Sequence, residues 1–168
     1  MQVDTLIRNT TILTMDAERR IVTDGAIAWS GDRIVAVGKT ADVEPLHSAK
    51  ETIDGRRFLV TPGFVNGHVH LTEALLKGFM PEALPFDESL FTWVMPLYEA
   101  HTPQEQQAAA RLAALSMMRT GTTTFLDAST TVALDEVFEA VEPSGLRGRF
   151  ARHAHAELWV CQAAAAGE

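Results

Sequence analysis

The chain has 168 residues, which is enough for one medium domain, or for one small domain and part of another. Its 46% of hydrophobic residues and its mean hydropathy of +0.02 are those of an ordinary globular protein. The net charge of −8 argues against a nucleic-acid partner.

The cysteine count and the lengths of the apolar runs predict the compartment and whether the chain contacts a membrane. Cys161 is the one cysteine, so an intrachain disulfide is excluded and nothing indicates an oxidising compartment. No run of eighteen or more apolar residues occurs, and no basic segment followed by a hydrophobic core opens the chain. We therefore expect a cytoplasmic protein that has no membrane partner.

The first sixty residues predict a small antiparallel β unit without an evident catalytic group. Residues 6–15 are rich in β-branched side chains, which favour strands. Two short strands at 25–29 and 33–37 flank the loop Ser30-Gly31-Asp32, a pattern typical of a hairpin. A single helical turn is expected within residues 40–46.

The next stretch, Thr61-Pro62-Gly63-Phe64-Val65-Asn66-Gly67-His68-Val69-His70, places two histidines one residue apart. In a strand, alternate side chains share a face, so the Cβ atoms of His68 and His70 lie roughly 6–7 Å apart. Two imidazoles at that spacing can bind one metal ion. Asn66 shares their face, whereas Val65 and Val69 point to the other, which suits packing under helices. Because an isolated His-x-His is more often accidental than a metal site, the prediction depends on its surroundings.

Residues 71–100 combine a loop with a predicted helix at 89–100. The loop at 81–87 contains two prolines and is placed at the mouth of the pocket that the histidines line. We expect Glu73, just past them, to be a solvated loop carboxylate. Four aromatic residues lie here, for which core packing is the first expectation and a substrate platform the alternative. They are Phe86, Phe91, Trp93 and Tyr98.

A helix from Thr102 to about Thr120 is the best-defined element of the sequence. Thr102 and Glu105 form a capping-box pattern, Pro103 occupies the first helical position, and Gly121 is placed to end the helix. The β-branched run 122–127 then predicts a strand, so the order strand, helix, strand indicates a right-handed parallel crossover.

Asp127 ends this second strand, near the end of the strand that carries the histidines. It is a candidate for orienting the metal ligands from behind, with helix capping as the alternative. A helix at about 132–141 and a third strand at about 146–151 follow. Arg147, Arg149 and Arg152 are interpreted as a solvated strand edge.

Four stretches, in this order and spacing, resemble the amidohydrolase superfamily, and within it the metal-dependent deaminases and chlorohydrolases. That branch includes cytosine and guanine deaminases, S-adenosylhomocysteine/methylthioadenosine deaminases and s-triazine hydrolases. The resemblance covers about residues 3–150. The stretches are Ile34-Val35-Ala36-Val37-Gly38, the segment from Thr61 to His70, Leu75-Leu76-Lys77-Gly78-Phe79, and the segment from Leu115 to Asp127, which includes Arg119-Thr120-Gly121-Thr122-Thr123-Thr124-Phe125-Leu126-Asp127.

The resemblance implies an α/β fold, a TIM-like (β/α)₈ barrel beside a small β-sandwich that both chain ends help to build. Because such a barrel takes about 250 residues, this chain has room for only the first two or three strand-helix units. We expect an N-terminal β-sandwich segment at 1–60, the start of the barrel at 61–151 and an unassigned tail at 152–168. The chain is thus expected to be the N-terminal part of such an enzyme, truncated and inactive alone.

For the site, the resemblance implies that His68 and His70 bind one Zn²⁺ or Fe²⁺ ion. The family's other ligands come from the fifth and eighth strands, and a histidine on the sixth assists catalysis, so no catalytic residue is assigned here. The implied reaction is hydrolysis of a small heterocycle, in which metal-activated water displaces an amino group or chloride.

Three alternatives remain open. The first is a cyclic amidase similar to dihydroorotase or hydantoinase, although Asn66 stands where many such relatives carry Asp. The second is a non-catalytic fragment that persists by associating with itself. A homo-oligomer is compatible with the deaminase and with the cyclic amidase as well. In the third, His153 and His155 are additional metal ligands.

Overall fold

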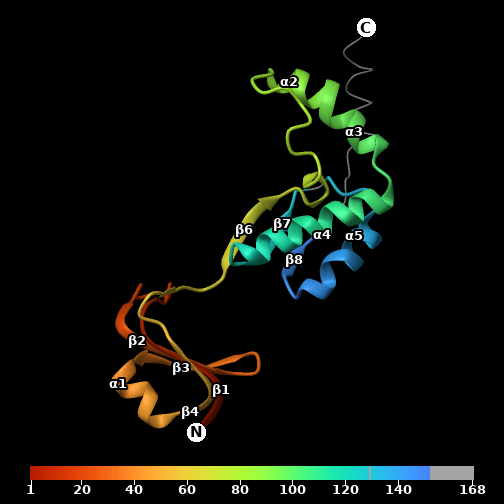
Figure 1. Cartoon of the computed structure of the whole chain (residues 1–168). Coiled ribbons are helices and arrows are strands. Elements are labelled where there is room, and N and C mark those ends of the chain that lie inside the picture. Colours follow the sequence, from red (N-terminus) through yellow and green to blue (C-terminus); the bar gives the residue numbers. More distant parts are fainter. Residues whose placement is uncertain (129, 152–168) are drawn as a thin grey trace. The chain divides into compact units, whose positions relative to one another are not determined.

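The computed structural model describes residues 1–128 and 130–151. The chain forms two compact units, Met1–Pro62 and a second that begins at Gly63. Both units are visible in Figure 1, the first in red to orange and the second in yellow to blue. The chain is a mixed α/β protein. His153, His155, Arg152 and Cys161 lie outside the described residues.

The N-terminal unit is a five-stranded sheet in the order β3-β2-β1-β4, with β5 also paired to β1. Its strands are β1 (Gln2–Leu13), β2 (Ile21–Ser30), β3 (Arg33–Lys39), β4 (Ser48–Asp54) and β5 (Leu59–Val60). Two helical turns, α1 (Thr40–Val43) and η1 (Glu44–Leu46), link β3 to β4. The core of this unit consists of Val3, Leu6, Ala26, Ala28 and Val43.

The expectation of an antiparallel unit is wrong for two of these strands. The β1–β2 and β2–β3 pairs are antiparallel, as hairpins require, but β4 and β5 run parallel to β1. The reason is the connection, because the helical turns after β3 return the chain to the end of the sheet where β1 begins. The sheet is therefore mixed.

The second unit contains three parallel strands in the order β6-β7-β8. In chain order, the three strands and the helical elements of the two crossovers that join them, apart from the segment between β6 and α4, are β6 (Phe64–Val69), α4 (Pro103–Arg119), β7 (Thr122–Asp127), α5 (Leu134–Val141), η4 (Glu142–Ser144) and β8 (Arg147–Arg149). The predicted parallel crossover is confirmed, and a second crossover repeats it. Arg147 and Arg149 are exposed, as expected of a solvated strand edge.

Helix α4 begins and ends where its local sequence predicts. Thr102 and Glu105 form the capping box, and Gly121, which follows the C-cap residue, has a φ of 81°. One face of the helix is lined with small side chains, which permit close packing against Phe125 of β7 and Val137 of α5. The residues of α4 that belong to this core cluster are Ala110, Ala113, Ala114 and Met117.

The segment between β6 and α4 is helical from Phe86 onward, earlier than predicted. After the turn η2 (Leu71–Glu73) come α2 (Phe86–Glu88), the π-helical turn η3 (Ser89–Val94) and α3 (Met95–Ala100). The rings of Trp93 and Phe79 pack edge to face with centroids 5.8 Å apart. Phe86 and Phe91 are 77% and 53% exposed, so core packing was the wrong expectation for these two. Among the described residues, no helix is both long and apolar enough to cross a membrane.

Candidate metal centre

His68 and His70 converge at the C-terminal end of β6. Their Nε2 atoms are 3.1 Å apart, and their ring centroids are 4.9 Å apart in an edge-to-face arrangement. Two imidazoles on one tetrahedral zinc, each with a Zn–N bond of about 2.05 Å, hold their nitrogens ~3.4 Å apart. The pair therefore fits two positions of one metal ion with little change.

The strand beneath the pair is less regular than the sequence predicts. The β6–β7 register shifts between Asn66 and Val69, and the Oδ1 atom of Asn66 accepts a hydrogen bond from the backbone N–H of His68 at 3.2 Å. Val69 packs against the core, as expected, but Val65 is 72% exposed. Val65 therefore does not pack under the helices as the sequence predicted.

Glu73 is not the solvated loop carboxylate that the sequence suggested. The turn η2 carries it back toward the site, where its Oε1 lies 3.5 Å from Nδ1 of His70. The same oxygen accepts a hydrogen bond from the Tyr98 hydroxyl of α3. Within the described part of the chain, the buried Nδ1 of His70 has no hydrogen-bond partner of good geometry. The signal in the sequence was a carboxylate three residues after a candidate ligand, one 3₁₀ turn away.

Tyr98 is held in its protonated form. Burial raises the pKa of its hydroxyl well above the ordinary value, and the adjacent Glu73 carboxylate raises this pKa further. Tyr98 therefore remains a hydrogen-bond donor across the physiological pH range. Sequence analysis grouped this residue with the aromatics and missed its polar role.

Asp127 lies buried at the end of β7, opposite Val69. Its Oδ1 accepts from the backbone N–H of Leu71 at 3.3 Å, and its Oδ2 accepts from the hydroxyl of Thr131 at 3.1 Å. Burial raises the pKa of this carboxyl group, while these two hydrogen bonds lower it. Asp127 thus fixes the residue that follows His70. Helix capping, the alternative, is not what the structure shows, because the N-cap residue of α5 is Ala133 and no side chain caps it.

The two histidines line an open groove of about 360 Å³, with Glu73 and Lys77 beside them and α4 contributing the other wall. Among residues 1–128 and 130–151, no group of three or more His, Cys, Asp or Glu side chains is placed to hold a metal ion. Catalytic zinc sites typically have three protein ligands. His68 and His70 alone fall short of that number.

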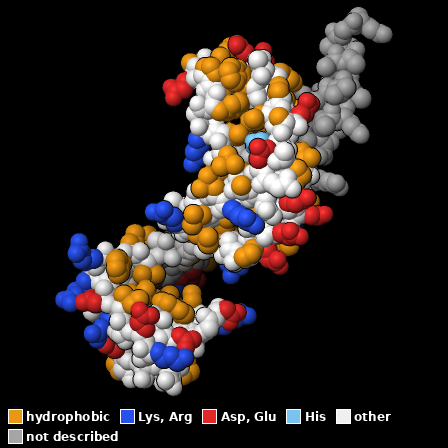
Figure 2. Space-filling model, turned by 45° about the vertical axis from the view of Figure 1, so that its right-hand side comes forward, with side chains coloured by type: hydrophobic (Ala, Val, Ile, Leu, Met, Phe, Trp, Pro, Cys, Tyr) orange, Lys and Arg blue, Asp and Glu red, His pale blue; other side chains and the backbone are white. Residues whose placement is uncertain are grey.

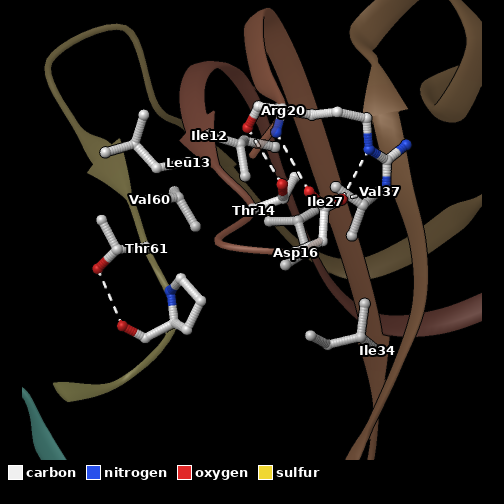
Figure 3. Close-up of a pocket in the computed structure, with 11 residues that line it drawn as sticks. Ile12, Leu13, Thr14, Asp16, Arg20, Ile27, Ile34, Val37, Val60 and Thr61 are labelled. Carbon is white, nitrogen blue, oxygen red and sulfur yellow. Dashed lines mark hydrogen bonds and ion pairs between the residues drawn. The ribbon is translucent and has the colours of Figure 1, made fainter. Parts of the chain in front are cut away.

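A second hollow, in the N-terminal unit, has a different character (Figure 3). It measures about 290 Å³ and is lined mainly by aliphatic side chains, among them Ile12, Ile27 and Val37. Its two charged residues bind each other, since Nε of Arg20 donates to Oδ2 of Asp16 at 2.7 Å.

Comparison with known proteins places these features in a family. A model of the amidohydrolase family matches residues 59–166. The chain is 36% identical over 144 residues to the 5-methylthioadenosine/S-adenosylhomocysteine deaminase of Nitratidesulfovibrio vulgaris strain Miyazaki F, covering 86% of this chain and 32% of that protein. It is 34% identical over 156 residues to the 5'-deoxyadenosine deaminase of Methanococcoides burtonii, covering 93% of this chain and 34% of the relative.

Two solved structures are similar in fold. A zinc-bound adenosine deaminase from Xanthomonas campestris superposes with a TM-score of 0.80 at 27% identity, over 88% of this chain and 33% of the other. A zinc complex of atrazine chlorohydrolase from Arthrobacter aurescens TC1 superposes with a TM-score of 0.72 at 29% identity, over 88% of this chain and 35% of the other. The chain spans about a third of the length of the curated relatives it matches. With the family model matching well over half of its residues, the chain belongs to the amidohydrolase family.

Proposed function

We propose that the chain is the N-terminal part of a metal-dependent hydrolase that acts on carbon-nitrogen or carbon-chlorine bonds of a small heterocycle, by hydrolytic deamination in the first instance. The observation that carries the proposal is the convergence of His68 and His70 within 3.1 Å at a strand end. The deaminases and the chlorohydrolase among its relatives support the substrate class.

The fold that goes with this function is the opening of a (β/α)₈ barrel. Three parallel strands joined by α4 and α5 support two to three strand-helix units at 61–151. In this proposal the segment 1–60 contributes to a β-sandwich, and 152–168 is an unassigned tail. In such barrels the reacting groups lie at the C-terminal ends of the strands, where His68, His70 and Asp127 lie. The single cysteine supports a cytoplasmic location.

In the site, His68 and His70 would hold one ion, Zn²⁺ or Fe²⁺, through their Nε2 atoms. When bound, such an ion would lower the pKa of its water to near neutrality and so supply hydroxide at neutral pH. The residues of this chain would bind the ion and orient its ligands: the histidines would fill two coordination positions, and Asp127 anchors the backbone after His70. Other ligands and the groups that transfer protons would come from further strands.

Metal content and ammonia release test this proposal. The purified chain, equilibrated with Zn²⁺ and then dialysed, is expected to retain zinc, whereas His68→Ala and His70→Ala variants lose it. His47→Ala, in the N-terminal unit, is the matched control and retains it. Ammonia release from aminated purine nucleosides and aminotriazines is expected only from a longer chain that carries the further ligands. A wild-type chain that retains no more zinc than the His68→Ala and His70→Ala variants would contradict the proposal.

The non-catalytic fragment remains a second candidate, favoured by exposed apolar surface. Phe64 and Val65 of β6 are 58% and 72% exposed, and Figure 2 shows hydrophobic side chains at the surface of both units. Apolar edges of this kind promote association. The coding sequence beyond codon 150, read in all frames, separates the two candidates, because an enzyme requires the later histidines and aspartate.

A further inference from the structure

We propose that Glu73 is a positioning residue: it holds His70 as the tautomer protonated on Nδ1, so that Nε2 is available to a metal ion, and Tyr98 holds Glu73 in place. The metal-binding part of this inference rests on the proposed function. The tautomer part does not, because it concerns the chain's own hydrogen bonds.

The contacts around His70 support this assignment. Its Nδ1 is buried, and the Oε1 of Glu73, 3.5 Å away, is an acceptor within reach of a small side-chain adjustment. The Tyr98 hydroxyl donates to the same oxygen and limits where it can move. Glu73 and His70 are each about one-third exposed, so their interaction is only partly screened by water.

The Nε2–Nε2 contact leads to the same conclusion. Two nitrogens 3.1 Å apart need one donor and one acceptor. If Glu73 keeps the proton on Nδ1 of His70, then Nε2 of His70 is the acceptor and Nε2–H of His68 is the donor. The hydrogen bond made by one ring nitrogen sets the state of the other. A carboxylate behind a metal-binding histidine uses the same principle to fix the ring and raise its basicity.

The first test reads the tautomer without metal. The ¹⁵N spectrum of the neutral histidine rings in the metal-free 168-residue chain is expected to show the single ring proton of His70 on Nδ1. Glu73→Ala is expected to shift His70 toward the Nε2–H form. Glu73→Gln retains an acceptor oxygen and should preserve the wild-type tautomer. Glu99→Gln, an exposed carboxylate on the same helix as Tyr98, is the matched control and should change nothing.

The second test measures zinc affinity by competition with a chelator. Loss of a carboxylate behind a ligand typically weakens metal binding about 10–100-fold, and we expect Glu73→Ala to fall in that range. Tyr98→Phe should give a smaller loss in the same direction, because Glu73 remains but is less constrained. Circular dichroism of each variant verifies that the unit is folded.

These outcomes separate the inference from the proposed function. Zinc that does not bind at His68 and His70 contradicts the proposed function, yet the metal-free tautomer still tests Glu73. The role of Glu73 is overturned if His70 of the wild-type chain is the Nε2–H tautomer. It is also overturned if the tautomer of His70 is unchanged in a folded Glu73→Ala variant. Unchanged zinc affinity in Tyr98→Phe, alongside a loss in Glu73→Ala, overturns the role of Tyr98.

Discussion

Asp4, near the start of β1, is a carboxylate of the N-terminal unit that neighbouring donors hold in its ionised form. The Lys50 ammonium, the backbone N–H of Gly31 and the Ser30 hydroxyl all donate to it and lower the pKa of Asp4 to about 2. A depressed folded-state pKa means that the ionised group stabilises the fold above its ordinary pKa, and that this contribution is lost as the pH falls toward about 2.

We therefore expect Asp4→Asn to lower the stability of the N-terminal unit at neutral pH and to flatten its pH dependence between about pH 4 and pH 2. Urea unfolding followed by Trp29 fluorescence, with the other tryptophans replaced by Phe, measures both effects. Asp32→Asn, an exposed carboxylate in the neighbouring hairpin, is the control. Superimposable pH profiles for wild type and Asp4→Asn would show that Asp4 contributes nothing.

Two glycines of the second unit provide a matched pair for core packing. A Cβ atom at Gly148 of β8 would overlap the ring of Phe125, which is fully buried, whereas a Cβ at Gly67 would meet nothing within 4 Å. Gly148→Ala is expected to destabilise the unit by about 1–3 kcal/mol, the usual cost of overpacking. Gly67→Ala should cost much less. Chemical denaturation of both variants checks this, and equal effects would show that the core near Phe125 adapts.

At the scale of elements, α4 depends on its first turn. Thr102 and Glu105 exchange hydrogen bonds, and those from the backbone N–H and hydroxyl of Thr102 lower the pKa of Glu105. Thr102→Ala is expected to cost about 1 kcal/mol of unfolding free energy, within a general range of about 0.5–2. Gln104→Ala, exposed in the same turn, should be nearly neutral. Hydrogen exchange in the first two turns of α4 locates the change, and protection equal to that of wild type would argue against the cap.

How far each element can be predicted depends on how local its determinants are. The bounds of α4 and the β6-α4-β7 crossover follow from nearby residues, namely the capping box, Gly121 and the β-branched run after it. The parallel pairing of β4 with β1 could not be predicted, because it joins residues more than forty positions apart. Glu73 was misjudged for a related reason, since its partner Tyr98 lies 25 residues further along the chain.

The candidate site shows the same division. The shared face of His68 and His70 follows from strand geometry, and their 3.1 Å contact agrees with it. The position of Asp127 near them followed from the expected parallel strands. The hydrogen bonds of Asp127 to Leu71 and Thr131 depend on loop conformations that no short pattern encodes.

At the scale of the whole molecule, the chain covers about a third of the length of the relative from Nitratidesulfovibrio vulgaris. It also exposes apolar residues on β6. We expect it to associate with itself in a concentration-dependent way, and Phe64→Ser together with Val65→Thr to reduce that association. Ile21→Thr, at a comparably exposed position in the N-terminal unit, is the control. Sedimentation velocity over a range of concentrations measures the change. Association that is unaffected by the β6 variants would place the interface elsewhere.

The central claim is that His68 and His70 bind one metal ion together through Nε2. A zinc titration of the chain, followed by the ¹⁵N signals of its histidine rings, tests this most directly. We predict that the Nε2 signals of His68 and His70 shift together and saturate at one zinc per chain, while those of His47 and His101 do not move. The spectrum also reports on His153 and His155. Shifts confined to those two, or none at His68 and His70, would contradict the account.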